Sequence, residues 1–302
     1  MNEEGFFLEQ LINKAKTLVE ALPYIKEFAK SMIIIKYGGS AMLDEKIQNS
    51  IIQDIALMKV VGFRPVVVHG GGPKINETLN KMNKVSQFVK GLRVTDQETM
   101  EVVEMVLSGQ INKDIVQRLE NAGVHAVGLS GKDGNTLQAN KLYIDGEDIG
   151  FVGEVKKIET ALLKTLIEDD FIPVIAPIGT DTKGNTYNIN ADYAALAIAS
   201  ALQARKLIFL TDVEGVLADV SDGNSLISKL YTDEVEDYIQ QGVISGGMIP
   251  KVQSCVEAIE NGVEQVHILD GRVEHSLLLE IFTQKGIGTL IEKRRGFNAK
   301  MD

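Results

Sequence analysis

Apolar residues recur at three- and four-residue steps over the first thirty positions, a pattern typical of an amphipathic helix. Pro23 is expected to kink or interrupt this helix, because proline lacks an amide hydrogen and crowds the preceding turn. The apolar stripe has to be covered by the chain's own core or by another subunit, and the pattern leaves both open. Its members are Leu8, Leu11, Ile12, Ala15, Leu18, Val19, Leu22 and Ile25.

Short apolar runs alternate with helical patterns from Met32 onward. Strands are expected at 32–35, 65–68, 126–129, 172–176, 207–210, 266–269 and 289–291, and helices at 47–61, 100–107, 111–119, 191–202, 247–260 and 275–283. Alternating polar and apolar residues around Asp145 and Gly146 predict a hairpin over 143–158, a lid or an edge. Thr95 and Glu98 have the spacing of a helix-capping box. Together these elements predict an α/β fold, a three-layer αβα sandwich with a mostly parallel central sheet.

The composition is that of an ordinary globular protein, with 44% hydrophobic and 24% charged residues. A net charge of −11 argues against binding to nucleic acid or to an anionic membrane through a basic face. No apolar run approaches the ~18 residues of a membrane span, and the acidic N-terminus does not resemble a targeting peptide. A single cysteine, Cys255, and four scattered histidines predict a reducing, cytoplasmic compartment and no metal site.

Three predicted strands run into glycine clusters: Gly38-Gly39, residues 70–72, and Gly131 with Gly134. Ligands bind beyond the carboxyl ends of strands in open α/β sheets, and glycine lets backbone N–H groups approach a phosphate closely. A single cluster is also explained by the needs of a strand–helix turn. The sequence contains neither G-x-x-x-x-G-K-[ST] nor G-x-G-x-x-G, nor the G-x-S-x-G of α/β-hydrolases, which argues against those three classes.

Three cations stand beside turns: Lys36 before the first glycine pair, Arg93, and Lys251 after a Gly-Gly turn. Taken singly, each is most often a solvated surface charge. Phosphoryl transfer, however, mainly requires fixed positive charge and backbone donors around the migrating group.

Five motifs occur in a characteristic order: KYGGS at 36–40, HGGGP at 69–73, GLRVTD at 91–96, NINAD at 188–192 and GGMIPK at 246–251. In this, the chain from about 32 to 291 resembles the N-acetylglutamate kinases of the amino acid kinase family. The helix before it is similar to that of the arginine-sensitive branch. The resemblance implies the amino acid kinase fold and ATP-dependent phosphorylation of the γ-carboxylate of N-acetyl-L-glutamate, the second step of arginine biosynthesis.

By the same resemblance, Lys36 and Lys251 contact the transferring phosphoryl group and Asp192 orients both lysines. This chemistry agrees with the residues. A carboxylate acceptor is ionised near pH 7 and needs no general base; it needs relief from repulsion by the γ-phosphate. Two lysines and the Mg²⁺ that accompanies ATP can supply that relief.

The implied binding residues divide into phosphate and acceptor contacts. Gly38 and Gly39 supply N–H groups to the phosphates. The acceptor contacts are Gly71 and Gly72 (which also face phosphate), Arg93 at the α-carboxylate, and Asn188 and Asn190 near the amide and carboxylate.

A regulatory site is implied by HILDGR at 267–272, Glu280 and GIGT at 286–289, which resemble the arginine-inhibition signature of that branch. Tyr24, His267, Glu280 and Gly286 are the candidates for binding L-arginine, with Glu280 facing the guanidinium. The alternative is that His267 and Glu280 are ordinary partly buried polar residues. The resemblance also implies a homohexamer, a trimer of dimers held by the N-terminal helices, and leaves open binding of a PII signalling protein.

The chain is therefore expected to divide into an oligomerisation helix (1–30), an acceptor-binding subdomain (31–203) and a nucleotide-binding subdomain (204–302). Two alternatives remain. One is a sibling kinase that acts on aspartate, glutamate, carbamate or uridylate. The other is a non-catalytic arginine sensor of the same fold, which would not need Lys36, Asp192 and Lys251.

Overall fold

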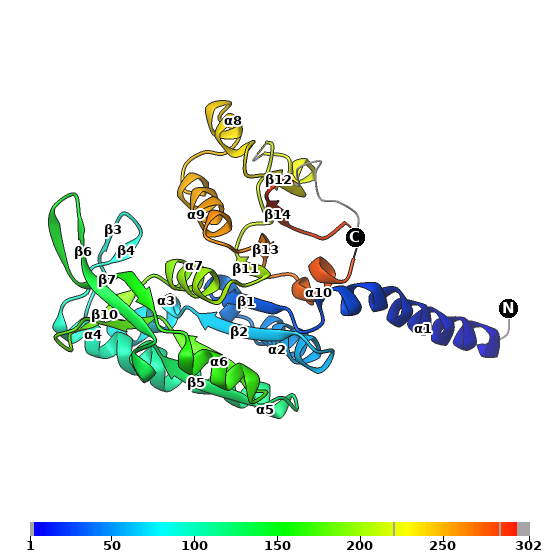
Figure 1. Ribbon diagram of the computed structural model, residues 1–302, viewed down its shortest axis with the longest axis horizontal. Helices are drawn as coiled ribbons and strands as arrows, with labels where there is room; N and C mark the ends of the chain where they lie inside the picture. The colour runs from blue at the N-terminus through cyan, green and yellow to red at the C-terminus, as the bar shows by residue number, and fades with distance from the viewer. Residues whose placement is uncertain (1–2, 220, 284, 295–302) are drawn as a thin grey trace.

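An eight-stranded sheet forms the centre of the computed structural model, which describes residues 3–219, 221–283 and 285–294 (Figure 1). The strand order is β12-β14-β13-β11-β1-β2-β8-β5. Neighbouring strands are parallel except β13 and β14, so the predicted mostly parallel sheet is confirmed. The strands are β1 (Met32–Tyr37), β2 (Arg64–His69), β5 (Ala126–Ser130), β8 (Ile172–Ala176), β11 (Lys206–Thr211), β12 (Lys229–Tyr231), β13 (Gln265–Asp270) and β14 (Thr289–Glu292).

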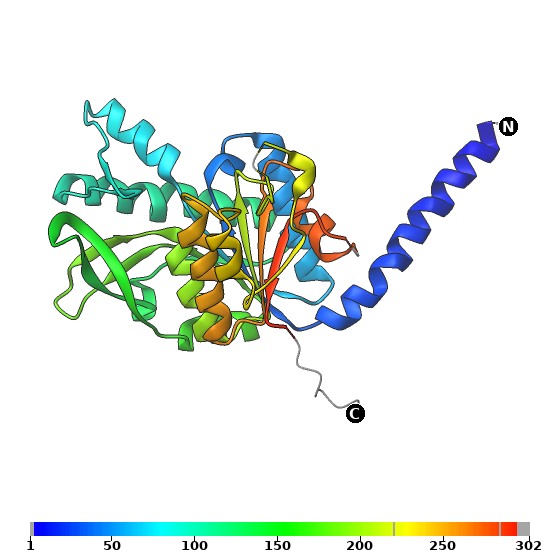
Figure 2. The same ribbon diagram turned by 90° about the horizontal axis from the view of Figure 1, so that it is seen from above.

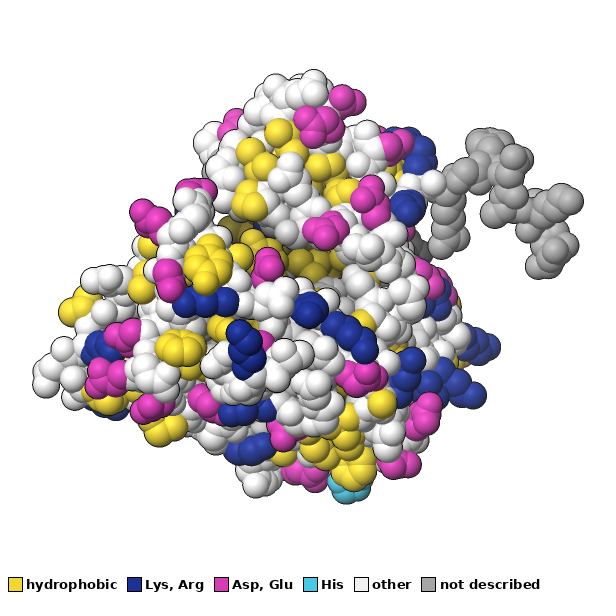
Figure 3. All heavy atoms as spheres, turned by 60° about the vertical axis from the view of Figure 1, so that its left-hand side comes forward, with side chains coloured by type: hydrophobic (Ala, Val, Ile, Leu, Met, Phe, Trp, Pro, Cys, Tyr) yellow, Lys and Arg dark blue, Asp and Glu magenta, His cyan; other side chains and the backbone are white. Residues whose placement is uncertain are grey.

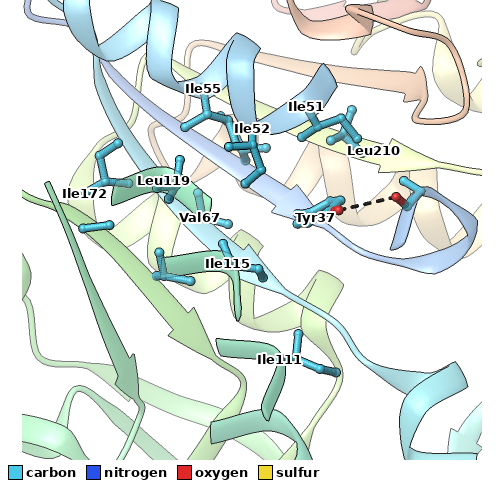
Figure 4. Packing of buried hydrophobic residues seen from close by; sticks show 14 of the residues in the cluster. Tyr37, Ile51, Ile52, Ile55, Val67, Ile111, Ile115, Leu119, Ile172 and Leu210 are labelled. Carbon is cyan, nitrogen blue, oxygen red and sulfur yellow. Dashed lines mark hydrogen bonds between the residues drawn. The ribbon is translucent and has the colours of Figure 1, made fainter. Parts of the chain in front are cut away.

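Helices cover both faces of this sheet, because successive residues of a strand point to opposite sides. Ile33 and Ile35 of β1 belong to one hydrophobic cluster and Ile34 to the other. The first cluster includes residues of α2 (Glu45–Val60), α3 (Gly72–Lys81), α4 (Gln97–Glu104), α5 (Asn112–Asn121) and α10 (Ser276–Ile281). The second includes residues of α6 (Ala161–Glu168), α7 (Ala191–Leu202), α8 (Val235–Gln240) and α9 (Met248–Glu260). Figure 4 shows the first cluster, where isoleucines of α2 face Val67 and Leu210 of the sheet. The three-layer αβα arrangement is confirmed.

The predicted hairpin is present as β6 (Leu137–Ile144) and β7 (Glu147–Ile158), joined by Asp145 and Gly146 at positive φ. It belongs to a closed four-stranded barrel with β9 (Ile178–Thr180) and β10 (Thr186–Ile189). In Figure 1 its tip projects at the left, close to the short pair β3 (Phe88–Val89) and β4 (Leu92–Arg93).

One continuous helical segment runs where two helices were expected. A π-helical stretch, Met105–Ile111, joins α4 to α5 without a break, because the wider π turn carries the helix through Ser108 and Gly109. The cap also differs from the expected box: the helix begins at Gln97, and the Asp96 carboxylate accepts from the Thr99 amide at 2.8 Å.

The N-terminal helix α1 (Glu3–Phe28) projects away from the rest of the molecule (Figures 1 and 2). The contacts of its described side chains with the body of the molecule lie at its end, where Phe28 is buried edge-on against Phe63 and Arg205 donates to the Glu27 carbonyl. The predicted interruption at Pro23 is wrong, since the helix continues through it. The exposed surface there lets water satisfy the carbonyl that proline leaves without a partner.

The apolar stripe on α1 is not covered by the chain's own core. Six of its leucine, isoleucine and valine side chains are 44–75% exposed. Of the two partners that the pattern left open, the chain's own core is therefore excluded for these positions: Leu8, Leu11, Ile12, Leu18, Val19 and Leu22.

The expected boundary near residue 203 falls inside a continuous sheet. Helix α7 ends at Leu202, Gln203 adopts a left-handed conformation, and β11 then pairs with β1 of the first half. Among the described residues, no helix combines the length and the hydrophobicity needed to cross a bilayer.

Candidate active site

The first two glycine runs lie side by side at the carboxyl edge of the sheet. Tyr37 of β1 is in register with His69 of β2, and the Gly70 amide donates to the Tyr37 carbonyl at 2.8 Å. Gly72 begins α3, so the free N–H groups of a ten-residue helix open onto this edge. The third run follows β5, the outermost strand of this sheet, and neither Gly131 nor Gly134 lines either of the cavities described below.

Lys36 lies at the centre of this edge and is paired with a carboxylate. Its Nζ is 2.9 Å from Asp192 Oδ1, and its side chain is 13% exposed. A Cβ on Gly38 would lie 3.2 Å from the Lys36 Nζ, so glycine at position 38 leaves room for the ammonium group. Asp192 is in the first turn of α7, whose N-terminus is capped by Asn190.

Lys251 comes to the same place from the other half of the chain. With Asp192 and Asn190 it lines a cavity of about 150 Å³, against Phe209 of β11 and the start of α9. The described residues include no ion pair between Lys251 and Asp192, and the expectation that Asp192 orients both lysines stays a prediction.

A second cavity of about 170 Å³ adjoins the first. All five residues predicted to bind the acceptor line it: Gly71, Gly72, Arg93, Asn188 and Asn190. Asn190 lines both cavities and therefore marks the point at which they meet. Figure 3 shows this face of the molecule hollowed, with hydrophobic side chains on the floor and lysine and arginine side chains along its lower margin.

Arg93 carries a buried charge into the second cavity. It is 7% exposed, and burial lowers the pKa of its guanidinium, which nevertheless stays protonated. Its partners are all neutral: Nη1 donates to Asn76 Oδ1 at 2.7 Å and to Ser86 Oγ at 2.5 Å, and Nη2 donates to the Gly72 carbonyl at 3.3 Å. The guanidinium also lies 4.8 Å from the centre of the Phe88 ring. No carboxylate among the described residues pairs with it, so an anionic ligand would complete its environment.

The two asparagines present different groups to the cavity. The Asn190 side-chain oxygen accepts from the Asp192 and Tyr193 amides, which leaves its NH₂ as the available group. The Thr95 hydroxyl donates its only proton to the Arg93 carbonyl at 2.7 Å, and it can therefore only accept from Asn188 Nδ2 at 3.3 Å. The Asn188 oxygen remains available as an acceptor.

Sequence reasoning missed the residues that hold this edge in shape. His69 is fully buried; its Nδ1–H donates to the Gly70 carbonyl at 2.9 Å and its Nε2 accepts from Asn112 at 3.2 Å. Burial lowers the His69 pKa to about 4, so this histidine is neutral. Leu107 and Ile111 of the π-helical stretch each come to 2.5 Å from the position of a Cβ on Gly71, so any larger residue there would require both side chains to move. No sequence signal marked these contacts, or those of Asn76 and Ser86 with Arg93.

Three of the four candidates for arginine binding form one buried cluster between β13 and α10. Glu280 Oε1 lies 2.7 Å from His267 Nδ1, and Oε2 accepts from the Ile287 and Gly288 amides at 2.7 and 3.0 Å. Gly286 has φ +61°, and a Cβ there would lie 2.5 Å from Glu280 Oε2. Burial raises the Glu280 pKa, but these hydrogen bonds outweigh it and the pKa is lowered.

The fourth candidate, Tyr24, lies near the end of α1 and packs with the hydrophobic cluster that includes Leu277 and Ile281 of α10. On the other side of His267, Lys206 Nζ approaches Nε2 at 3.1 Å. Burial and this ammonium group lower the His267 pKa, so the imidazole is neutral.

Fixed cations, glycine-lined backbone and a helix N-terminus at the carboxyl edge of a parallel sheet define an enzyme of the phosphotransferase class. The sequence agrees: residues 31–270 match the model of the amino acid kinase family, and the chain belongs to that family. The predicted membership of the amino acid kinase family, the fold and the assignment as a kinase are thereby confirmed, and the likeness to the arginine-sensitive branch stays a prediction.

Close relatives carry one name. The chain is 56% identical to the acetylglutamate kinase of Heliobacterium modesticaldum over 93% of this chain and 99% of that protein. It is 57% identical to the acetylglutamate kinase of Pelotomaculum thermopropionicum, over 93% of this chain and 98% of that protein.

Solved structures share the fold. N-acetylglutamate synthase from Neisseria gonorrhoeae, solved with coenzyme A and N-acetyl-glutamate, superposes with a TM-score of 0.83 at 29% identity. The match covers 93% of this chain but only 64% of the synthase. Carbamate kinase from Giardia lamblia, solved with AMP-PNP, matches with a TM-score of 0.62 at 18% identity, over 88% of this chain and 99% of that chain, which is a likeness of fold alone.

Proposed function

We propose that this enzyme transfers the γ-phosphoryl group of ATP to the γ-carboxylate of N-acetyl-L-glutamate, giving N-acetyl-L-glutamyl 5-phosphate and ADP in the second step of arginine biosynthesis. The name shared by relatives above 50% identity supports this acceptor. The observation that carries the proposal is the buried Arg93 guanidinium, which has only neutral partners and lies in a cavity that meets the lysine-lined cavity at Asn190.

In this reaction the acceptor's α-carboxylate binds Arg93, and its γ-carboxylate lies near the meeting point of the two cavities. Lys36 and Lys251 neutralise the oxygens of the phosphoryl group during transfer, when their negative charge would otherwise repel the incoming carboxylate. Asp192 holds the Lys36 ammonium in place through the 2.9 Å ion pair. Backbone amides of Gly38, Gly39, Gly71 and Gly72 bind phosphate oxygens.

Mg²⁺ would reach the site on the ATP phosphates, where it would neutralise charge on the phosphate oxygens. The described residues hold no group of three or more histidine, cysteine, aspartate or glutamate side chains placed to bind a metal ion. This fits Mg²⁺, which keeps several waters and uses substrate phosphates with one or two carboxylates. Asp192 is the carboxylate at hand.

The hairpin β6–β7 would serve as a lid. Gly150, in the outer half of the hairpin near the turn, approaches Thr95 closely, and the Phe151 amide donates to the Thr95 carbonyl at 2.6 Å, which ties the hairpin to the segment that follows β4. The acyl phosphate product is readily hydrolysed, so excluding water would protect it.

The decisive experiment traps the acyl phosphate with hydroxylamine in the presence of ATP and Mg²⁺. N-acetylglutamate, glutamate, aspartate and carbamate are compared as acceptors, and uridylate is followed by ADP release. Hydroxamate from N-acetylglutamate alone supports the proposal. Preference for another acceptor would replace it with a sibling kinase, and no product from any acceptor would leave a non-catalytic arginine sensor.

L-Arginine is proposed as the feedback inhibitor, bound by Tyr24, His267, Glu280 and Gly286. The proximity of the last three supports a common site. Both oxygens of Glu280 already accept hydrogen bonds from the chain itself, so the guanidinium would bind beside these bonds or displace the one from His267.

The same proposal includes a homohexamer held by α1, whose exposed apolar stripe supports burial against another subunit. Removing residues 1–28 should abolish arginine inhibition and leave active dimers, as measured by light scattering and steady-state kinetics. Full inhibition of the truncated enzyme would contradict the arginine site, and intact hexamers would contradict the role of α1.

Residues 31–203 are proposed to bind the acceptor and 204–302 the nucleotide, in a cytoplasmic enzyme. Limited proteolysis with each substrate separately would test the division, and cell fractionation the location. Binding to a PII signalling protein stays a prediction that co-purification would test.

A further inference from the structure

Most of the polar groups that line the second cavity are hydrogen-bond donors. Arg93 and the NH₂ of Asn190 can only donate, and the helix α3 begins there with free amides. Among the described residues that line the cavity, the oxygen of Asn188 is the single free side-chain acceptor, and none of these residues is an aspartate or a glutamate.

The side chains of the rest of the lining are apolar. Leu107 of the π-helical stretch is 2% exposed and closes the cavity against Gly71, while Val152 of β7 and Ile189 of β10 are 2% and 3% exposed. A group bound against these side chains has only the few polar atoms of the cavity as protein partners, while the cavity opens to solvent beside Phe88, which is 53% exposed.

Because of these two features, an acylated amine and a free amine fit the cavity differently. An acylamino group has one N–H, which the Asn188 oxygen can accept, and a carbonyl that suits the donors. A free ammonium has three N–H groups and a positive charge. It would be attached to the carbon next to the carboxylate on Arg93, close to that uncompensated guanidinium, with no carboxylate in the lining to offset the repulsion.

We propose that this cavity selects its acceptor by excluding the positive charge of a free amine. Acylation is then required mainly because it removes the charge from the nitrogen, and less because the acetyl group itself is bound. The inference rests on the proposed function. It predicts that an acceptor with no ammonium group is used even when it has no acetyl group either.

The test compares L-glutamate with (S)-2-hydroxyglutarate, which has nearly the same shape and carboxylates but a neutral hydroxyl in place of the ammonium. Glutarate serves as a second neutral probe, and N-acetylglutamate reports on the proposed function itself. Each compound is assayed as an acceptor by hydroxamate formation and as a competitor of N-acetylglutamate. We expect the inhibition constant of 2-hydroxyglutarate to be at least ~10-fold lower than that of glutamate.

Equal inhibition constants for 2-hydroxyglutarate and glutamate, with N-acetylglutamate still phosphorylated, would overturn the inference and leave the proposed function intact. Failure of N-acetylglutamate to react would instead remove the proposed function.

Variants that add a carboxylate to the wall sharpen the test. Leu107→Asp places it in the buried wall and Leu92→Asp at a half-buried position that tolerates change better; Leu107→Asn and Leu92→Asn are the uncharged controls. The measure is the ratio of glutamate to 2-hydroxyglutarate affinity within each variant, which cancels any effect on Arg93 because both compounds carry the same carboxylates. A folded Asp variant should raise this ratio ~10-fold or more over its Asn control. An unchanged ratio at both positions would overturn the proposal.

Discussion

Two buried polar sites in this enzyme are built on opposite principles. In the acceptor cavity, Arg93 has four neutral partners and no carboxylate among the described residues. In the cluster of β13 and α10, Glu280 receives three hydrogen bonds from its own chain and is 4% exposed. The first site is electrostatically incomplete until an anion binds, whereas the second is complete without a ligand.

Because of this difference, the first site is suited to binding a ligand and the second to stabilising the fold. A buried charge without a counter-ion costs folding free energy and retains its attraction for a ligand. A buried charge whose hydrogen bonds are all made by the chain contributes to the fold, and a ligand must compete with those bonds. Substitutions in the acceptor region should therefore change kinetics, and substitutions in the Glu280 cluster should change stability.

The largest effect is expected for the lysines. Lys36→Ala or Lys251→Ala should lower kcat by ~10³-fold with little change in KM, because their charge is needed most in the transition state. Steady-state kinetics with purified variants measure this. Lys46→Ala, which removes an exposed lysine paired with Glu274, is the control and should keep full activity. Unchanged kcat in both active-site variants would contradict the mechanism.

Arg93→Met should raise KM for the acceptor by ~100-fold, because a charge-assisted pair with the substrate carboxylate is lost. Its Tm without ligands should stay the same or rise, since an uncompensated buried charge has been removed. Calorimetry and initial rates test both parts. Arg294→Met, at a surface arginine paired with Asp233 and Glu234, should leave KM unaltered. A large loss of stability in Arg93→Met would show that Arg93 is a structural residue.

In contrast to Arg93→Met, Glu280→Gln should lower the free energy of unfolding by about 2–4 kcal/mol and leave kcat and KM nearly unchanged. The lost charge leaves His267 and two backbone amides with a poorer acceptor. Urea denaturation measures the change, with the exposed Glu274→Gln as the matched control. Wild-type stability of Glu280→Gln together with impaired catalysis would show that Glu280 serves the reaction and does not stabilise the fold.

The smallest effect concerns pH. Burial lowers the pKa of His69 to about 4 from its ordinary value near 6.5, so below pH 6.5 the unfolded chain binds a proton that the folded chain does not. Its contribution to stability is fully present above pH 6.5 and is lost as the pH falls toward 4. The lowered pKa of Glu280 acts in a more acidic window, below its ordinary value.

His69→Gln should therefore flatten the dependence of unfolding free energy on pH between 6.5 and 4 by up to one proton, relative to the wild type. Denaturant melts at several pH values measure the slope. Glu280→Gln should instead change the slope mainly below the ordinary pKa of its carboxyl group, and it also removes the carboxylate that raises the pKa of His267. An unaltered slope in His69→Gln would mean that the histidine is not neutral in the folded enzyme.

Much of this architecture could be predicted because it depends on local patterns. The hairpin around Asp145 and Gly146 and the helix 191–202 follow from hydrophobic periodicity and turn chemistry, and both were found as expected. The errors came where exposure or packing overrode a local rule. Pro23 did not interrupt a helix that is surrounded by solvent, and a π-helical stretch carried one helix past Gly109.

The candidate site likewise combines properties that the sequence predicts with properties that it does not. The sequence motifs by themselves identify the residue types at the site, among them Lys36, Arg93, Asn188, Asp192 and Lys251. The electrostatic state of these residues could not be predicted from the sequence, because it depends on neighbours distant in the chain. Ser86 and Asn76 accept hydrogen bonds from the Arg93 guanidinium. Burial keeps His69 neutral, and Asn112, 43 positions away, donates to its ring nitrogen.

The sequence by itself determined the class of fold, the order of its elements and the chemical groups available for phosphoryl transfer, because short-range periodicity and residue type encode them. Only the tertiary structure decided which buried charge is left without a counter-ion and which is already satisfied. Burial and hydrogen bonding between residues far apart in the chain set that balance, and no local pattern records it.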